Sequence, residues 1–118
     1  MQEGNVILTP VPQADGAVKN RPAIILREMP LYKDLLVCGV STQLYQQVKS
    51  FDEIISLSDT DFAASGLKSE SLIRLGFLAV LPRSHIIGTI GSISPERHKR
   101  LLKTLSDYLV KPVALRLP

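Results

Sequence analysis

The sequence has too few cysteines and histidines for several common kinds of functional site. Cys38 is the only cysteine among 118 residues, so the chain forms no internal disulfide, and its apolar surroundings favour a buried, unreactive thiol. The two histidines, His85 and His98, lie on different expected elements and offer no cluster of metal ligands. Glycine-rich phosphate-binding motifs are missing as well, so we expect neither a metal nor a nucleotide cofactor.

Long apolar runs and a strong net charge are also missing. No stretch approaches the roughly 20 apolar residues of a membrane helix, and the N-terminal apolar run is too short for a secretory signal. We therefore expect a cytoplasmic protein with no membrane partner. The net charge of +3 tolerates an anionic partner without requiring one. Residues 52–61 hold four acids and no base, and residues 97–103 hold four bases and no acid, which we interpret as two solvated faces.

Short apolar runs separated by turn residues indicate a mainly β fold in a single domain spanning residues 1–118. A brief capped helical turn is expected at Ser58–Gly66, and a bulge at Gly76. Five to seven short strands without a long helix between them favour a small, strongly curved sheet or barrel. The expected strands are Val6–Leu8, Pro22–Leu26, Leu35–Val40, Phe51–Leu57, Ser71–Leu75 continuing as Phe77–Leu81, and His85–Ile90.

The clearest helix signal lies near the end of the sequence. Ser94 suits the N-cap and Pro95 the first helical position, while Lys111-Pro112 ends the helix. Apolar residues recur at spacings of three and four and predict one buried face: Leu101, Leu102, Leu105, Tyr108 and Leu109. We assign no role to the tail Val113–Pro118.

The stretch Thr9–Leu26 combines turn residues with a cation at the start of a strand. We expect the first strand to stop at Pro10, followed by a loop that ends in three polar residues, Lys19, Asn20 and Arg21. Because Pro22 follows it, Arg21 has an extended backbone and projects a guanidinium from a stiff position, as suits a phosphate. Local chemistry alone supports an ordinary long hairpin and a functional site equally.

Three other polar side chains stand among apolar residues. Ser41 and Thr42 end a buried strand, where small hydroxyl residues form turns more often than sites. Arg74 lies inside an apolar strand and needs either an ion pair or an anionic ligand; an ion pair with Asp52, Glu53 or Glu70 is slightly favoured. Two guanidinium groups and two hydroxyls, if they converge, would suit a phosphodiester.

These motifs resemble the MazF/PemK family of toxin endoribonucleases over nearly the whole chain. The resemblance rests on the first loop with the strand Arg21–Leu26, on Val40–Gln43, on Ser71–Arg74 and on the closing helix. It implies a small SH3-like β barrel with a C-terminal helix, acting as a homodimer that is inhibited by a cognate antitoxin. It also implies metal-independent cleavage of single-stranded RNA, in which the 2′-hydroxyl attacks the adjacent phosphate and leaves a 2′,3′-cyclic phosphate.

The resemblance also implies residue roles. Arg21 would hold the phosphate and act in proton transfer, Ser41 (or Thr42, since the register is uncertain by one) would be the catalytic hydroxyl, and Arg74 would support the transition state. Gly76 stands where some members carry an acid, so the general base stays open between Asp15, His85 and Arg21 itself. The further expected substrate contacts are Asp15, Lys19, Asn20, Gln43 and His85.

Two other functions remain open from the sequence. A non-catalytic SH3-like module could bind nucleic acid or a peptide, although three Tyr, three Phe and no Trp are few for a single-strand binder that relies on stacking. A DNA-binding regulator would need a recognition helix, and the apolar face of the C-terminal helix suits core packing instead.

Overall fold

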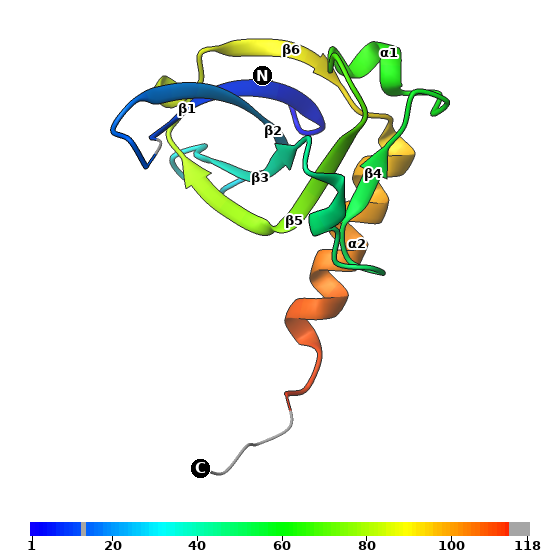
Figure 1. Ribbon diagram of the computed structural model, residues 1–118. Coiled ribbons are helices and arrows are strands. Elements are labelled where there is room, and N and C mark those ends of the chain that lie inside the picture. The colour runs from blue at the N-terminus through cyan, green and yellow to red at the C-terminus, as the bar shows by residue number, and fades with distance from the viewer. Residues whose placement is uncertain (13, 114–118) are drawn as a thin grey trace.

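The computed structural model describes residues 1–12 and 14–113. The chain forms one six-stranded antiparallel sheet, in the order β4-β5-β3-β2-β1-β6, that curls into part of a barrel with one long helix beside it (Figure 1). The strands are β1 (Asn5–Pro12), β2 (Val18–Glu28), β3 (Leu35–Ser41), β4 (Glu53–Ile55), β5 (Ser71–Leu81) and β6 (Gly88–Ser92). The predicted mainly β fold with a C-terminal helix is confirmed, and six strands lie within the expected five to seven.

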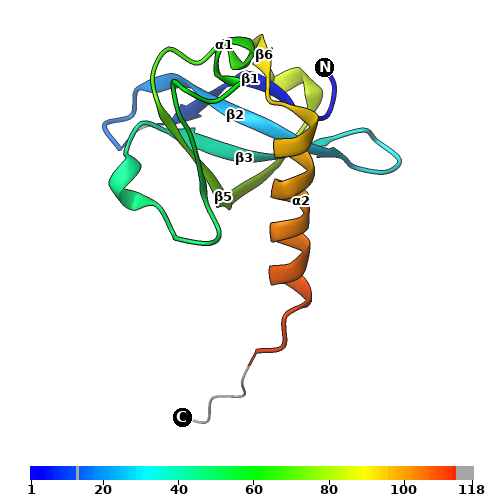
Figure 2. The same ribbon diagram turned by 90° about the vertical axis from the view of Figure 1, so that its right-hand side faces the viewer.

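The long helix α2 (Pro95–Val110) begins where the sequence predicts, because the Ser94 hydroxyl accepts the backbone N–H of Arg97 at 3.1 Å. Leu101 and Leu105 are buried against the sheet. The last turns extend beyond the sheet (Figure 2), so Leu109 is 69% exposed and the predicted buried face is wrong there. Among the described residues, none of the helices has the length and apolar character that crossing a membrane requires.

The shorter helices are single turns at the edges of the sheet. They are η1 (Leu44–Gln46), α1 (Phe62–Ser65) and η2 (Arg83–His85). Gly66 ends α1 with a φ of 73°, and a Cβ at this position would lie 2.0 Å from the carbonyl oxygen of Ile90 in β6. Only glycine allows this approach, so the predicted glycine end of the helical turn is confirmed. The apolar tail at 114–118 lies outside the described residues.

Apolar side chains form two clusters, one on each face of the sheet. Neighbouring residues of a strand point to opposite faces, so Val6 and Ile24 belong to a cluster under α2, while Ile7 and Ile25 belong to the other cluster. β2 is thereby buried on both faces from residue 23 to residue 26, as its continuous apolar run predicts. Cys38 is fully buried in the larger cluster, as predicted.

The first hairpin differs from its prediction. Pro10 does not end the strand, and three residues expected in a loop lie on β2: Lys19, Asn20 and Arg21. Pro10 pairs with Asn20, and Thr9 pairs with Arg21. The connection is therefore shorter than the sequence suggests, and Arg21 is held by a strand pair.

Pro10 is tolerated because its missing N–H faces an open edge of β1. The Leu8 carbonyl accepts the backbone N–H of Ile87 at 2.9 Å, so the polar backbone groups of Leu8 point away from β2. Pro10, two residues on, points the same way, and the pairing of β6 with β1 covers only Asn5–Leu8. No ladder hydrogen bond with β2 is lost.

The predicted strand His85–Ile90 is also wrong in its first half. Residues 83–85 form the turn η2, and pairing starts only at Gly88. The Arg83 side chain explains the turn, because its Nε donates to the Lys33 carbonyl at 3.1 Å and its guanidinium pairs with Glu28. These contacts fasten the segment to the β2–β3 connection instead of leaving it extended.

The acidic and basic runs meet each other and are not two solvated faces. Arg97 is only 6% exposed, and its guanidinium bonds to Asp61 at 2.8 Å and to Asp59 and Glu53 at 2.9 Å each. Arg100 also pairs with Glu53, at 2.9 Å. This ion-pair network fastens the first turns of α2 to β4 and to the segment before α1.

Candidate active site

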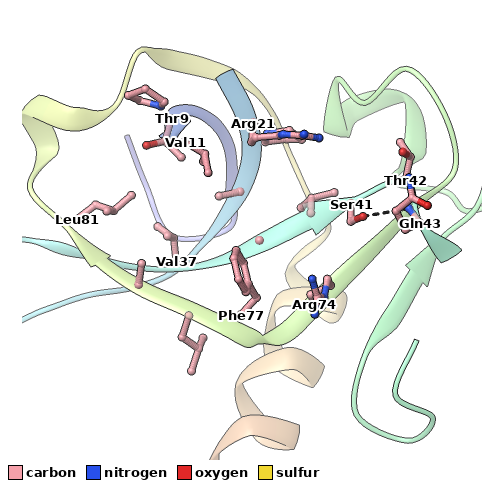
Figure 3. Close-up of a pocket in the computed structure, with 17 residues that line it drawn as sticks. Thr9, Val11, Arg21, Val37, Ser41, Thr42, Gln43, Arg74, Phe77 and Leu81 are labelled. Atoms are coloured by element: carbon pink, nitrogen blue, oxygen red, sulfur yellow. Dashed lines mark hydrogen bonds between the residues drawn. The ribbon is translucent and has the colours of Figure 1, made fainter. Parts of the chain in front are cut away.

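A groove of about 510 Å³ opens between β1, β2, β3 and β5 (Figure 3). Apart from Thr9, which is buried on β1, the polar or charged lining residues lie toward one end: Arg21, Ser41, Thr42, Gln43 and Arg74. Val37 and Leu81 lie toward the other end, and Phe77 stands between the two groups (Figure 3). The sequence-predicted catalytic residues are therefore brought together in one place.

Gly39 of β3 lies at the centre of this arrangement. It pairs with Ala23 of β2 on one side and with Arg74 of β5 on the other. Arg21 and Ser41 each lie two residues beyond the pair Ala23–Gly39 on their own strands, and alternate residues share a sheet face. Strand register thus gathers the two arginines and Ser41 around a residue that has no side chain.

Three consecutive groove residues follow from the end of β3. The Ser41 hydroxyl oxygen accepts the backbone N–H of Gln43 at 3.0 Å (Figure 3), which shapes the turn that begins η1. Its own proton stays available for a second partner, because a hydroxyl donates once and accepts twice. Thr42 and Gln43 are exposed beside it. The sequence left open whether Ser41 forms a turn or belongs to a site, and in the structure it forms the turn and also lines the groove.

Arg74 does not make the ion pair that the sequence favoured. Within the described ranges it has no carboxylate partner; Asp52 and Glu70 accept backbone N–H groups, and Glu53 pairs with the arginines of α2. The guanidinium carbon of Arg74 lies instead 5.2 Å from the ring centroid of Phe77. A cation over an aromatic face is held by the quadrupole of the ring.

A bulge in β5 places Phe77 beside Arg74. The register passes from Gly39–Arg74 to Cys38–Leu78, so residues 75–77 have no matching residue on β3, and the bulge predicted at Gly76 is confirmed. The buried carboxylate of Asp52 holds the first bulged residue by accepting the Leu75 N–H at 3.0 Å. The bulge interrupts the regular alternation of side chains, so that Arg74 and Phe77, three residues apart, both line the groove.

The electrostatics of the groove suit an anion. In the part of the chain that the structure describes, its lining residues include two arginines and no carboxylate. Guanidinium groups donate paired hydrogen bonds to phosphate oxygens, and a hydroxyl adds a further donor. Among the described residues, no three His, Cys, Asp or Glu side chains gather where they could hold a metal ion. The arrangement can therefore bind a phosphodiester and stabilise negative charge that develops on it.

The comparison with known proteins agrees with this geometry. The sequence profile described as PemK-like, MazF-like toxin of type II toxin–antitoxin system matches residues 2–109. The chain belongs to this toxin family. The resemblance drawn from the Arg21-Pro22 strand and the later motifs is thus confirmed. A comparison with curated protein sequences finds no match.

Solved structures show the same PemK/MazF fold. The Mycobacterium tuberculosis toxin MazF-mt6 is similar with a TM-score of 0.63 and 18% identity, over 89% of this chain and 95% of that one. An endoribonuclease in complex with its cognate antitoxin, from a mycobacterial species, is similar with a TM-score of 0.67 and 14% identity, over 97% of this chain and 99% of that one. Identities this low establish the shared fold.

In this PemK/MazF chain, four expected substrate contacts do not line the groove. Asp15 lies in the β1–β2 turn, where its carboxylate accepts the backbone N–H of Ala17 at 2.9 Å. Lys19 and Asn20 are exposed on β2, and His85 is exposed at the end of η2. Their part in binding stays a prediction.

Among the groove residues that sequence reasoning missed are Gly39 and Phe77, which pack against each other and set the shape of the groove. Neither stands out locally, because Gly39 lies inside an apolar strand and Phe77 continues one. The bulge at Gly76 was a usable signal, since an extra residue shifts which side chains face the groove.

Proposed function

We propose that this PemK/MazF-family chain is an endoribonuclease that cleaves single-stranded RNA in the groove without a metal ion. The observation that carries the proposal is the convergence of Arg21, Arg74 and the Ser41 hydroxyl in a groove with no carboxylate lining. An RNA phosphate brings its own nucleophile, the neighbouring 2′-hydroxyl, so the protein has to supply position, positive charge and proton transfer.

Each of these groove residues has a separate role in a single displacement step. The 2′-oxygen loses its proton and attacks phosphorus, the bond to the 5′-oxygen breaks, and the 5′-oxygen takes up one proton. The products are a 2′,3′-cyclic phosphate and a 5′-hydroxyl, with no net change in protons. Arg21 holds the phosphate oxygens and acts in proton transfer; Asp15 and His85 do not line the groove, which favours Arg21 over them. Ser41, with Thr42 as the alternative, donates a hydrogen bond to the oxygen on which charge develops, and Arg74 adds a second cation.

We further propose a cognate antitoxin as the inhibitory partner in the cytoplasm. The similar mycobacterial endoribonuclease is known in complex with its own antitoxin. An acidic segment with apolar side chains would match both the cationic and the apolar end of the groove.

A homodimer is the proposed working state. Exposed apolar side chains on the last turns of α2, such as Leu109 and Val110, support it, because burial against a second copy would remove them from water. Sedimentation equilibrium tests this state, and a monomer at micromolar concentration would contradict it.

Product analysis tests the proposed reaction. The purified chain is incubated with a long RNA in EDTA, and the new 3′ ends are examined for a cyclic phosphate. We expect discrete fragments that carry 2′,3′-cyclic phosphate and 5′-hydroxyl ends. Intact RNA, or cleavage that EDTA abolishes, would refute the proposal. Intact RNA that stays bound to the chain would favour the non-catalytic binding module.

A further inference from the structure

We infer that Phe77 is a stacking platform for one nucleobase of the RNA, next to the phosphate held by Arg21 and Arg74. The inference rests on the proposed function and adds the residue that receives a base. It assigns the apolar half of the groove to the substrate as well as the cationic half.

The exposure of Phe77 is the first observation. Its side chain belongs to a strand of the sheet, yet it is 60% exposed, and no other aromatic side chain among the described residues lines the groove. An aromatic ring left open to water in a groove forgoes burial that folding would otherwise supply. Leu78 beside it is 40% exposed and also lines the groove. An exposed apolar patch of this kind is typical of a surface that a ligand covers.

The ring is also held in place before any ligand binds. A Cβ on Gly39 would fall 2.7 Å from the Phe77 Cδ1 atom, so the ring rests against backbone that only glycine leaves clear. The Arg74 guanidinium carbon lies 5.2 Å from the ring centroid. Contacts with Gly39 and Arg74 limit ring motion, and a preorganised surface loses less entropy on binding.

The position of the ring matches the two halves of a nucleotide. Phe77 stands between the cationic end of the groove and apolar residues such as Val37 and Leu81 (Figure 3). A phosphate at the arginines would leave its attached base beside the ring. Unpaired bases of RNA stack on aromatic side chains, and every base offers a flat face. The neighbouring cations favour a nucleotide over a purely apolar side chain at this position.

Binding of an oligonucleotide that cannot be cleaved tests the inference without requiring activity. A single-stranded 2′-O-methyl RNA lacks the attacking hydroxyl, and its dissociation constant is measured by fluorescence anisotropy. We expect Phe77→Leu to bind about tenfold more weakly, because base stacking on an aromatic ring is lost. Phe77→Trp should bind at least as tightly as the wild type. The matched control is Tyr32→Leu, which removes an aromatic side chain that is 80% exposed and does not line the groove.

The dependence of binding on salt separates stacking from an indirect effect through Arg74. Loss of one phosphate contact lowers the slope of log affinity against log salt by about 0.7 for a single strand. We expect this smaller slope for Arg74→Gln and an unchanged slope for Phe77→Leu. A Phe77→Leu chain whose affinity equals that of the wild type, or whose slope falls like that of Arg74→Gln, would overturn the stacking role.

The cleavage and binding assays together distinguish failure of the stacking role from failure of the proposed ribonuclease activity. If the wild type cleaves RNA but Phe77→Leu binds like the wild type, the stacking role fails and the ribonuclease stands. If the wild type binds without cleaving and Phe77→Leu binds more weakly, the stacking role stands and the ribonuclease fails. A wild-type chain that does not bind the oligonucleotide overturns the stacking role, whatever the cleavage assay shows.

Discussion

Arg97 donates to both carboxylate oxygens of Asp61, from Nε to Oδ2 at 2.8 Å and from Nη2 to Oδ1 at 3.2 Å. The two residues are 36 positions apart in sequence and both are buried. Asp61 also accepts the backbone N–H of Ser94 at 3.0 Å, immediately before α2. The pair therefore fastens the start of α2 to the segment that precedes α1.

Replacing Arg97 with methionine should destabilise the fold strongly. The substitution keeps apolar volume but leaves buried Asp61 without its cation, and breaking a buried pair in this way costs about 3–5 kcal/mol. That is a large share of the roughly 5–15 kcal/mol by which domains are stable. Urea unfolding measures the change. Lys103→Met is the control on the same helix, since Lys103 is exposed and pairs with the exposed Asp107. An equal loss in both variants would contradict the role of Arg97.

The same pair predicts how stability depends on pH. Burial opposes ionisation of the Asp61 carboxyl, but hydrogen bonds from Arg97 and Ser94 and the charge of Arg97 outweigh it, so the pKa of Asp61 is lowered. A lowered folded-state pKa stabilises the fold above the unfolded pKa, and this contribution is lost as pH falls through the folded value.

Asp61→Asn should therefore differ most from the wild type above about pH 4, the range of an unfolded aspartate. Below that pH the difference in the free energy of unfolding should shrink. Unfolding in urea between pH 7 and pH 2.5 measures it. A difference that stays constant over this range would show that ionisation of Asp61 does not stabilise the fold.

Gly39→Ala should impair cleavage more than stability. The added methyl group would push the Phe77 ring off the contact with Gly39 that holds it in place, and the ring has space on its exposed side, so we expect a stability change under about 1 kcal/mol. Cleavage of RNA should fall about tenfold because the ring and Arg74 shift together. Gly88→Ala is the matched control, since a Cβ there has open space, and it should cleave like the wild type. Equal cleavage by both variants would contradict the positioning role of Gly39.

Cys38 should be unreactive in the folded protein. Burial raises the pKa of its thiol to about 12, with a smaller contribution from the charge of Asp52, so the reactive thiolate is scarce at pH 8. An aromatic disulfide reagent should label the chain only after unfolding in urea. Fast labelling of one thiol per native chain would show that the strand around Cys38 opens readily.

Local signals in the sequence predicted several elements well. Ser94 and Pro95 located the start of α2, and Gly76 located the bulge in β5. These features depend on residues close together in the chain. The prediction failed where the local conformation depends on residues that are distant in the sequence. Pro10, for example, stays in its strand because β6 pairs with only part of β1.

For the candidate site, too, the sequence predicted individual residues but not the contacts between distant ones. Arg21, Ser41 and Arg74 could be singled out because each is polar next to an apolar strand. Their convergence depends on the register of three strands around Gly39, which no local pattern encodes. The buried position of Arg97 was missed for the same reason, since its acidic partners lie in a distant run.

We propose that Arg21 in the groove drives RNA cleavage, and its replacement should show this in a rate measurement. Wild type, Arg21→Ala and Arg27→Ala are incubated with the same RNA in EDTA, and initial rates are measured. Arg27 is an exposed cation of the same strand that pairs with Glu3 and does not line the groove. We predict that Arg27→Ala cleaves like the wild type and that Arg21→Ala is about 100-fold slower or worse. An Arg21→Ala chain that cleaves as fast as the wild type would show that Arg21 does not drive cleavage.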